Sequence, residues 1–235
     1  EILKSSPYYE GAQSNLGILY NQLGEHQKAK NCLEKVIQIN PNNLAAYYNL
    51  GIILHELGEN QKAISYYEKA IQINPNNSAV YYNLGNTLKE LGENQKAISC
   101  YENAIQINPN HIDAHNNLGI ILKELGENQK AISCYEKVIQ INPNFANAYY
   151  NLGVILNELG ENQKAMNCYE KAIKINPNYF EAYNNLGNIL KELGENQKAM
   201  SSYEKAIEIN PDYVNAHNNL GVILNELGEN QKAMN

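Results

Sequence analysis

A block of eight residues recurs along this chain at a fixed interval of 34 residues. The octapeptide ELGENQKA begins at Glu56, Glu90, Glu124, Glu158, Glu192 and Glu226, and the near copy QLGEHQKA begins at Gln22. The seven prolines and the seven Asn-Leu-Gly triplets keep the same spacing. Repetition at this period indicates an array of small units that pack on their neighbours, because one unit alone cannot bury its apolar face.

Each unit is predicted to form two amphipathic helices joined by a tight turn. In residues 44–77, apolar residues recur at steps of three and four before Gly58 and again after it, which is helical spacing. Gly58 suits the left-handed backbone past a helix end, and Asn60 is predicted to cap the second helix. The residue before Pro75 disfavours helical geometry and ends that helix. Gly51 is predicted to lie where the two helices cross closely.

The period divides the chain into six complete units and two incomplete ends. The complete units are residues 10–43, 44–77, 78–111, 112–145, 146–179 and 180–213, and positions are counted from the first residue of each. Residues 1–9 are interpreted as the tail of a preceding unit, with Ile2 and Leu3 in its second helix, and residues 214–235 as a partial seventh unit. Because a solenoid normally ends in a polar capping helix and none is visible, we expect a fragment of a longer array.

Several positions of the unit carry the residue types of a known family. In residues 78–111 they are Tyr81, Leu84, Gly85, Ala97, Tyr101, Ala104 and Pro109. This order of an aromatic residue, Leu-Gly, Ala, a second aromatic residue, Ala and Pro resembles the tetratricopeptide repeat family. The departures are Gln13, Leu33, His115 and His217 at aromatic positions, and Val36 and Val138 at an alanine position. The resemblance implies an all-α fold, a right-handed superhelical solenoid of antiparallel helix pairs.

Charge and motifs argue against several classes of function. The formal net charge is −7, whereas phosphate binding needs a basic stripe, so we expect no nucleic-acid partner. No apolar run approaches the roughly 18 residues of a membrane span, so we expect no membrane partner. The chain contains no HExxH, GxGxxG or phosphate-loop motif and no triad-like arrangement of its histidines. We therefore predict a protein that is not an enzyme and binds no metal or cofactor.

Four cysteines, Cys32, Cys100, Cys134 and Cys168, are separated by multiples of 34 residues and so lie on different units. Neighbouring helix pairs stack about 10 Å apart. A disulfide needs Cα atoms within about 7 Å, which makes a bridge along the stack unfavourable. Unpaired thiols are typical of a reducing compartment. We therefore expect an intracellular, cytoplasmic protein.

The family resemblance implies that ligands bind a concave wall lined by the first helix of each unit. The face opposite the packing stripe comprises positions 2, 5, 6, 9, 12 and 13. Position 6 is asparagine in all seven units: Asn15, Asn49, Asn83, Asn117, Asn151, Asn185 and Asn219. Positions 5 and 9 add Tyr48, Tyr82, Asn116, Tyr150, Asn184, Asn218, Asn86 and Asn188. An asparagine offers one acceptor and two donors, so this row is predicted to hold the backbone of an extended peptide, with tyrosines adding contact area.

The row of asparagines resembles that of O-GlcNAc transferase repeat arrays, in which such a ladder binds peptide backbone. Asparagine at position 6 is also common in the family consensus, and it would then have a structural role. A clamp of Lys and Arg for a terminal carboxylate is disfavoured, because positions 2, 5 and 6 contain neither residue.

We therefore predict a scaffold that binds a protein or an extended peptide along the concave groove. Two alternatives stay open. Nearly identical units with open ends would also stack end to end, which makes a self-assembling structural array. The array would equally serve as the substrate-docking arm of a larger glycosyltransferase-like enzyme.

Overall fold

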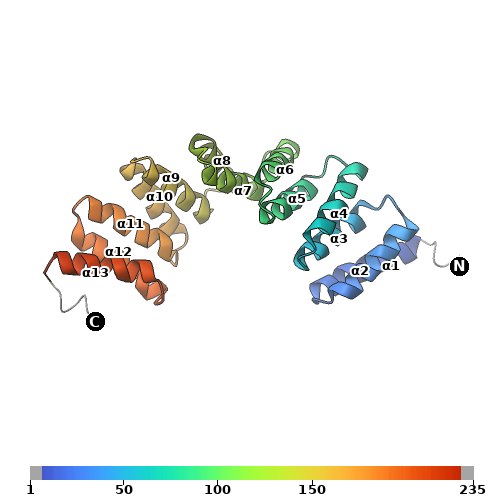
Figure 1. The fold of residues 1–235 in the computed structure, drawn as a ribbon, viewed down its shortest axis with the longest axis horizontal. Helices are drawn as coiled ribbons and strands as arrows, with labels where there is room; N and C mark the ends of the chain where they lie inside the picture. The colour runs from blue at the N-terminus through green and yellow to red at the C-terminus, as the bar shows by residue number, and fades with distance from the viewer. Residues whose placement is uncertain (1–6, 229–235) are drawn as a thin grey trace. The chain divides into compact units, whose positions relative to one another are not determined.

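The structure, a computed structural model, describes residues 7–228, which form thirteen helices joined by short turns (Figure 1). The first helices of the repeats are α1 (Pro7–Gln22), α3 (Leu44–Glu56), α5 (Ser78–Glu90), α7 (Ile112–Glu124), α9 (Ala146–Glu158), α11 (Phe180–Glu192) and α13 (Val214–Glu226). The second helices are α2 (His26–Ile39), α4 (Asn60–Ile73), α6 (Asn94–Ile107), α8 (Asn128–Ile141), α10 (Asn162–Ile175) and α12 (Asn196–Ile209). The fold is the predicted all-α solenoid of helix pairs.

The chain divides into two compact units, Glu1–Ala114 and His115–Asn235, and the division falls within α7. Within each unit, a first helix packs on its own second helix and on the second helix of the preceding repeat. In the first unit α3 contacts both α4 and α2, and in the second unit α11 contacts both α12 and α10. Figure 1 shows these pairs stacked in chain order within each unit. No helix among residues 7–228 is both long enough and apolar enough to cross a membrane.

A left-handed glycine makes the turn between the two helices of a repeat, as predicted. Gly58 has a φ of 73°, and the other six glycines at this position have φ between 73° and 77°. The Gly58 N–H donates to the His55 carbonyl at 2.9 Å and the Glu59 N–H donates to the Leu54 carbonyl at 2.8 Å. This pair of bonds closes the end of α3 and satisfies two carbonyls that the helix leaves open.

The second helix starts one residue earlier than predicted. Asn60 is the first residue of α4, and Glu59 occupies the N-cap position without a capping hydrogen bond from its side chain. The predicted cap at Asn60 is therefore wrong. The reason is that a single residue separates the left-handed Gly58 from the helix, and the Glu59 carboxylate pairs with Lys62 instead.

The two helices of a repeat approach closely at the glycine of the Asn-Leu-Gly triplet, which confirms the predicted crossing. A Cβ added to Gly51 would lie 2.4 Å from Cε1 of Tyr67, a ring that is 1 % exposed. The same contact recurs at Gly85 with Tyr101, at Gly119 with Tyr135, at Gly153 with Tyr169 and at Gly187 with Tyr203. Five buried tyrosines thus form the core between paired helices, and each needs a neighbour without a side chain.

The first described helix is longer than its counterparts. α1 begins at Pro7, before the predicted start of the first complete unit at Glu10. Proline is tolerated in the first turn of a helix, because the N–H that it lacks would have no partner there. The interpretation of Ile2 and Leu3 as part of a preceding helix, and that of a second helix after Gly228, lie outside the described residues.

Candidate functional site

The sequence-predicted binding residues lie on the first helix of each repeat. We call the surface formed by positions 2, 5, 6, 9, 12 and 13 of these helices the ladder face, because their spacing places them on one side of a helix. Asn15 and Asn218 on this face are exposed, and Asn184 is buried. The other predicted residues are half-buried: Asn49, Asn83, Asn117, Asn151, Asn185, Asn219, Tyr48, Tyr82, Tyr150, Asn116, Asn86 and Asn188.

Hydrogen bonds join position 6 of one repeat to position 5 of the repeat before it. Nδ2 of Asn83 donates to the Tyr48 hydroxyl at 2.8 Å. Nδ2 of Asn185 donates to the Tyr150 hydroxyl at 3.4 Å, and Nδ2 of Asn219 donates to Oδ1 of Asn184 at 3.0 Å. Tyrosine and asparagine at position 5 therefore serve the same purpose, since each offers an oxygen to the next repeat.

These bonds occupy some of the polar atoms of the ladder face. Asn83 uses both amide hydrogens within the protein, because its Nδ2 also donates to the Ala79 carbonyl at 3.1 Å. Asn219 likewise donates to Oδ1 of Asn188 at 2.9 Å as well as to Asn184. The sequence analysis assumed that each asparagine has two donors and one acceptor available for a peptide backbone. Both donors of Asn219 link repeats, whereas Asn83 uses one donor to link repeats and the other within its own helix. In both residues the carbonyl oxygen is the group left over.

The asparagines at position 9 accept hydrogen bonds from the hydroxyl groups of buried tyrosines. The Tyr101 hydroxyl donates to Oδ1 of Asn86 at 2.8 Å, and the Tyr203 hydroxyl donates to Oδ1 of Asn188 at 2.9 Å. Burial raises the pKa of Tyr203 to about 12. A buried hydroxyl needs a partner, so Asn86 and Asn188 have a structural role in addition to their place on the ladder face.

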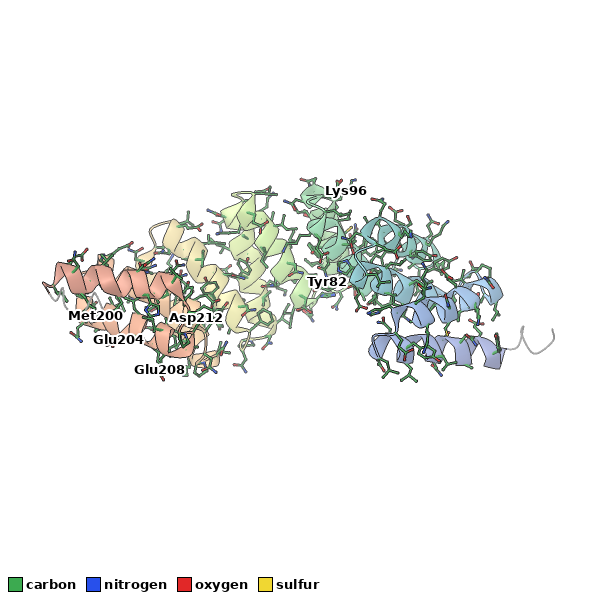
Figure 2. The ribbon with its side chains drawn as sticks, turned by 60° about the horizontal axis from the view of Figure 1, so that its bottom comes forward. Tyr82, Lys96, Met200, Glu204, Glu208 and Asp212 are labelled. Carbon is green, nitrogen blue, oxygen red and sulfur yellow. The ribbon has the colours of Figure 1, made fainter. Side chains whose placement is uncertain are left out.

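Tyrosines at position 5 stack on the residue that precedes the next repeat. The Tyr82 ring lies 4.9 Å from the His111 ring, and the Tyr150 ring lies 4.8 Å from the Tyr179 ring, measured between centroids. Figure 2 shows Tyr82 on α5, whereas Lys96 projects from α6 at the opposite edge of the same repeat. The aromatic residues of the ladder face thus lie apart from the charged outer surface of the second helices.

Position 34, which sequence reasoning missed, changes its role along the array. Asn43 caps α3 by accepting a hydrogen bond from the Ala46 N–H at 2.9 Å, and Asn77 caps α5 in the same way. In the second unit the N-cap residues of α9, α11 and α13 are Phe145, Tyr179 and Tyr213, and none makes a capping hydrogen bond. Losing such a cap costs about 1 kcal/mol. The signal was present in the sequence as a change from asparagine to aromatic residues.

Tyr150 lies against Tyr179 in the second unit, and Tyr213 is the counterpart of Tyr179 one repeat later; we call these three tyrosines the aromatic cluster. Phe180 packs edge-on against Tyr213 with ring centroids 4.8 Å apart. Burial holds the pKa of Tyr179 well above its usual range, and the nearby Tyr150 and Glu181 raise it further. Burial likewise raises the pKa of Tyr150, with smaller contributions from the charges of Glu181 and Tyr213. Glu181 follows Tyr179 by two residues, in the first turn of α11.

Ion pairs along the ladder face join position 12 of one repeat to position 13 of the next. Nζ of Lys123 lies 3.0 Å from Oε1 of Glu158, and Nζ of Lys191 lies 3.1 Å from Oε1 of Glu226. Nε2 of His55 lies 3.4 Å from Glu90 in the first unit. Exposed pairs of this kind contribute under about 1 kcal/mol each, so they organise the surface more than they stabilise the fold.

Other features of the described residues offer little for chemistry. Burial raises the pKa of the Cys100 and Cys168 thiols to about 11, so both are protonated and unreactive at neutral pH. A cavity of about 440 Å³ on the side of the second helices is lined by Glu34, Ile37, Gln38, Tyr47, Ser65, Tyr66 and Lys69. Between residues 7 and 228 no three His, Cys, Asp or Glu side chains are grouped as a metal ion would require.

Sequence profiles of one family match most of the chain. A profile described as TPR repeat matches residues 85–126, 121–160, 155–194 and 187–228. Two profiles described as tetratricopeptide repeat match residues 8–76 and 66–99. A comparison with curated protein sequences found no significant match.

Solved structures with the same fold cover much of the chain. A crystal structure of MamA is 30% identical over 69% of this chain and 95% of its own, with a TM-score of 0.66. YrrB, described as a TPR protein with an unusual peptide-binding site, is 24% identical over 78% of this chain and 95% of its own, with a TM-score of 0.68. PilF of Pseudomonas aeruginosa is 21% identical over 90% of this chain and 96% of its own, with a TM-score of 0.77. The last two similarities concern the fold alone.

Proposed function

The chain belongs to the tetratricopeptide repeat family, and on that premise we propose that it is a protein-interaction scaffold whose ladder face binds an extended peptide. The observation that carries this proposal is the bond from Asn83 to the Tyr48 hydroxyl and its counterparts in the second unit. Each bond holds two side chains of the ladder face in place before a ligand arrives. Groups that are already ordered lose less conformational freedom on binding, which favours affinity.

An extended peptide fits this surface better than a small molecule does. The ladder face repeats an asparagine at position 6 once every 34 residues, so its polar groups form a row along the array. A peptide backbone, with its regular donors and acceptors, matches a regular row of amides. The likeness of the ladder to that of O-GlcNAc transferase arrays supports this mode of contact, as does the shared fold with YrrB, which is described as having a peptide-binding site.

The direct test replaces ladder asparagines and measures peptide binding. We expect the triple variant Asn117→Ala, Asn151→Ala and Asn185→Ala to lose binding to peptides selected on an array with the parent protein. The matched control is Asn103→Ala with Asn167→Ala, because both residues are exposed on second helices of the repeats. Far-ultraviolet circular dichroism checks that both variants keep the helicity of the parent. Unchanged binding by the ladder variant, or an equal loss in the control, contradicts the proposal.

A second function, end-to-end association, is favoured by one observation on α1. Leu16 and Leu19 are 39% and 48% exposed, whereas Leu50 and Ile53 at the same positions of α3 are 0% and 1% exposed. In α3 these residues face the preceding helix α2, so α1 presents an apolar face that a further helix would cover. Light scattering against protein concentration tests this function, and Leu16→Glu should reduce any association. A species that stays monomeric at all concentrations contradicts it.

A further inference from the structure

We propose that the ladder face of the second unit recognises a basic peptide, and that one Lys or Arg side chain of the peptide binds between the aromatic cluster and Glu181. This inference rests on the proposed function, because it assumes that the ligand is a peptide. The inference goes beyond the proposed function because it names the charge of the peptide and the residues that recognise this charge.

Two members of the aromatic cluster, Tyr179 and Tyr213, occupy N-cap positions at which asparagine would stabilise the helix better. Asn43 and Asn77 cap their helices, whereas Tyr179 and Tyr213 at the same position do not. Residues that break a local rule of stability are expected at functional sites. The Tyr179 ring lies 4.8 Å from the Tyr150 ring, and both are half-buried, so each keeps part of its surface open to a ligand. Faces of aromatic rings attract ammonium and guanidinium groups.

Glu181 supplies a carboxylate two residues after Tyr179. It lies in the first turn of α11, directly after Tyr179 and Phe180, and is half-buried. Within the described part of the chain its side chain makes no hydrogen bond or ion pair. A carboxylate next to aromatic rings offers a cation both a charge-assisted hydrogen bond and a ring face.

The charge of the surrounding ladder face also favours a cation. In the second unit its charged residues are Lys123, Lys191, Glu124, Glu158, Glu181, Glu192 and Glu226. Both lysines already pair, with Glu158 and Glu226. The three remaining carboxylates leave this face negatively charged, and a surface of one sign attracts partners of the other.

The polarity of the ladder favours a donating ligand at Asn219, whereas the carbonyl oxygen of Asn185 already accepts from the Asn184 amide. Asn219 donates both amide hydrogens within the protein, to Asn184 and Asn188, and this leaves its carbonyl oxygen for a ligand. An oxygen accepts hydrogen bonds, so the ligand has to donate them. Lysine and arginine carry donors only, three and five respectively. A basic peptide therefore suits the hydrogen bonds as well as the charge.

The test compares three fluorescein-labelled probes, oligo-arginine, oligo-glutamine and oligo-glutamate, by fluorescence anisotropy with the whole chain. We expect oligo-arginine to bind and the other two to bind at least about tenfold more weakly. Glu181→Gln should weaken oligo-arginine binding about tenfold. The control is Glu204→Gln, since Glu204 is an exposed carboxylate of α12 in the same unit and lies outside the ladder face (Figure 2).

Tyr179→Asn separates binding from folding. It introduces the residue that caps α3 and α5 at this position, and the new cap offsets part of the packing that is lost with the ring. The variant should therefore stay folded, which far-ultraviolet circular dichroism checks. Binding of oligo-arginine should nevertheless fall about tenfold, because a ring face is lost. If the variant keeps the helicity of the parent and binds less, unfolding cannot explain the loss of binding.

Three results would overturn the inference. The first is that oligo-arginine binds no better than oligo-glutamine. The second is that Glu204→Gln loses as much binding as Glu181→Gln, and the third is that Tyr179→Asn binds as the parent does. If array-selected peptides still depend on the ladder asparagines in that case, the inference fails and the proposed function stands. If oligo-arginine depends on Glu181 and Tyr179 while the asparagine variant loses no binding, the proposed ladder mode fails and the cation site stands.

Discussion

The amide of Asn83 donates a hydrogen bond of 2.8 Å to the hydroxyl of Tyr48, which lies one repeat earlier in the chain. Both side chains are half-buried on the ladder face. The bond ties two consecutive repeats together on the surface that we propose for ligand binding. Stability and recognition therefore share the same side chains, and substitutions there are expected to affect both.

Tyr48→Phe removes the acceptor of this bond while it keeps the ring. We expect the first unit to lose about 1 kcal/mol of unfolding free energy, which is typical for one hydrogen bond. Urea denaturation followed by circular dichroism measures the change. The control is Tyr149→Phe, because the Tyr149 hydroxyl has no hydrogen-bond partner among residues 7–228. Equal stability of the two variants contradicts a stabilising role for the bond.

Gly51→Ala tests the close helix crossing. The added Cβ would lie 2.4 Å from Tyr67, so we expect a loss of about 1–3 kcal/mol even though alanine is the better helix former. Gly11→Ala in α1 is the matched control, since a Cβ there meets nothing within 4 Å. That variant should be neutral or more stable by up to about 1 kcal/mol. Thermal melts that rank the two variants the other way contradict the packing.

Ala131→Glu tests the core of the second unit. Ala131 is 0% exposed, and burial of an unpaired carboxylate costs several kcal/mol, about 3 or more. We expect a broad melt with lost cooperativity, because each repeat depends on its neighbours. Ala45→Glu is the control, as Ala45 is exposed in the first turn of α3, where a carboxylate is tolerated. A melt of the Ala131 variant like that of the parent means that the helix register is wrong.

Alkaline pH should destabilise the fold through its buried tyrosines. Burial raises the pKa of Tyr203 from 10.0 to about 12, so the folded chain holds this proton where the unfolded chain has lost it. The contribution to stability is complete below pH 10 and disappears as the pH rises from 10 to about 12. Melting temperatures across this range should fall, and Tyr203→Phe should make the fall shallower. The same slope in parent and variant would argue against Tyr203 as a source.

Local features of the fold could be predicted from the sequence because they depend on few residues. Gly58 ends a helix and Gly51 admits Tyr67, and each follows from the spacing of glycine and apolar residues within one repeat. The prediction of a cap at Asn60 was wrong, because the length of a turn depends on how the backbone leaves the preceding glycine. The types of the residues alone do not determine that backbone geometry.

The organisation of the ladder face was harder to predict, because it depends on contacts between repeats. The sequence identifies Asn185 and Tyr150 as members of one surface, but their hydrogen bond depends on how neighbouring helices are offset. The approach of Tyr179 to Tyr150 depends on the same offset. The sequence analysis assigned no role to position 34, so it missed the change from caps to aromatic residues.

The central claim is that an extended peptide binds the ladder face, and nuclear magnetic resonance of asparagine side-chain amides tests it most directly. Titration with an array-selected peptide should shift the amide resonances of Asn151, Asn185 and Asn219 and leave those of Asn103 and Asn167 unchanged. Shifts confined to Asn103 and Asn167, or no shift in the ladder at saturating peptide, would contradict the account.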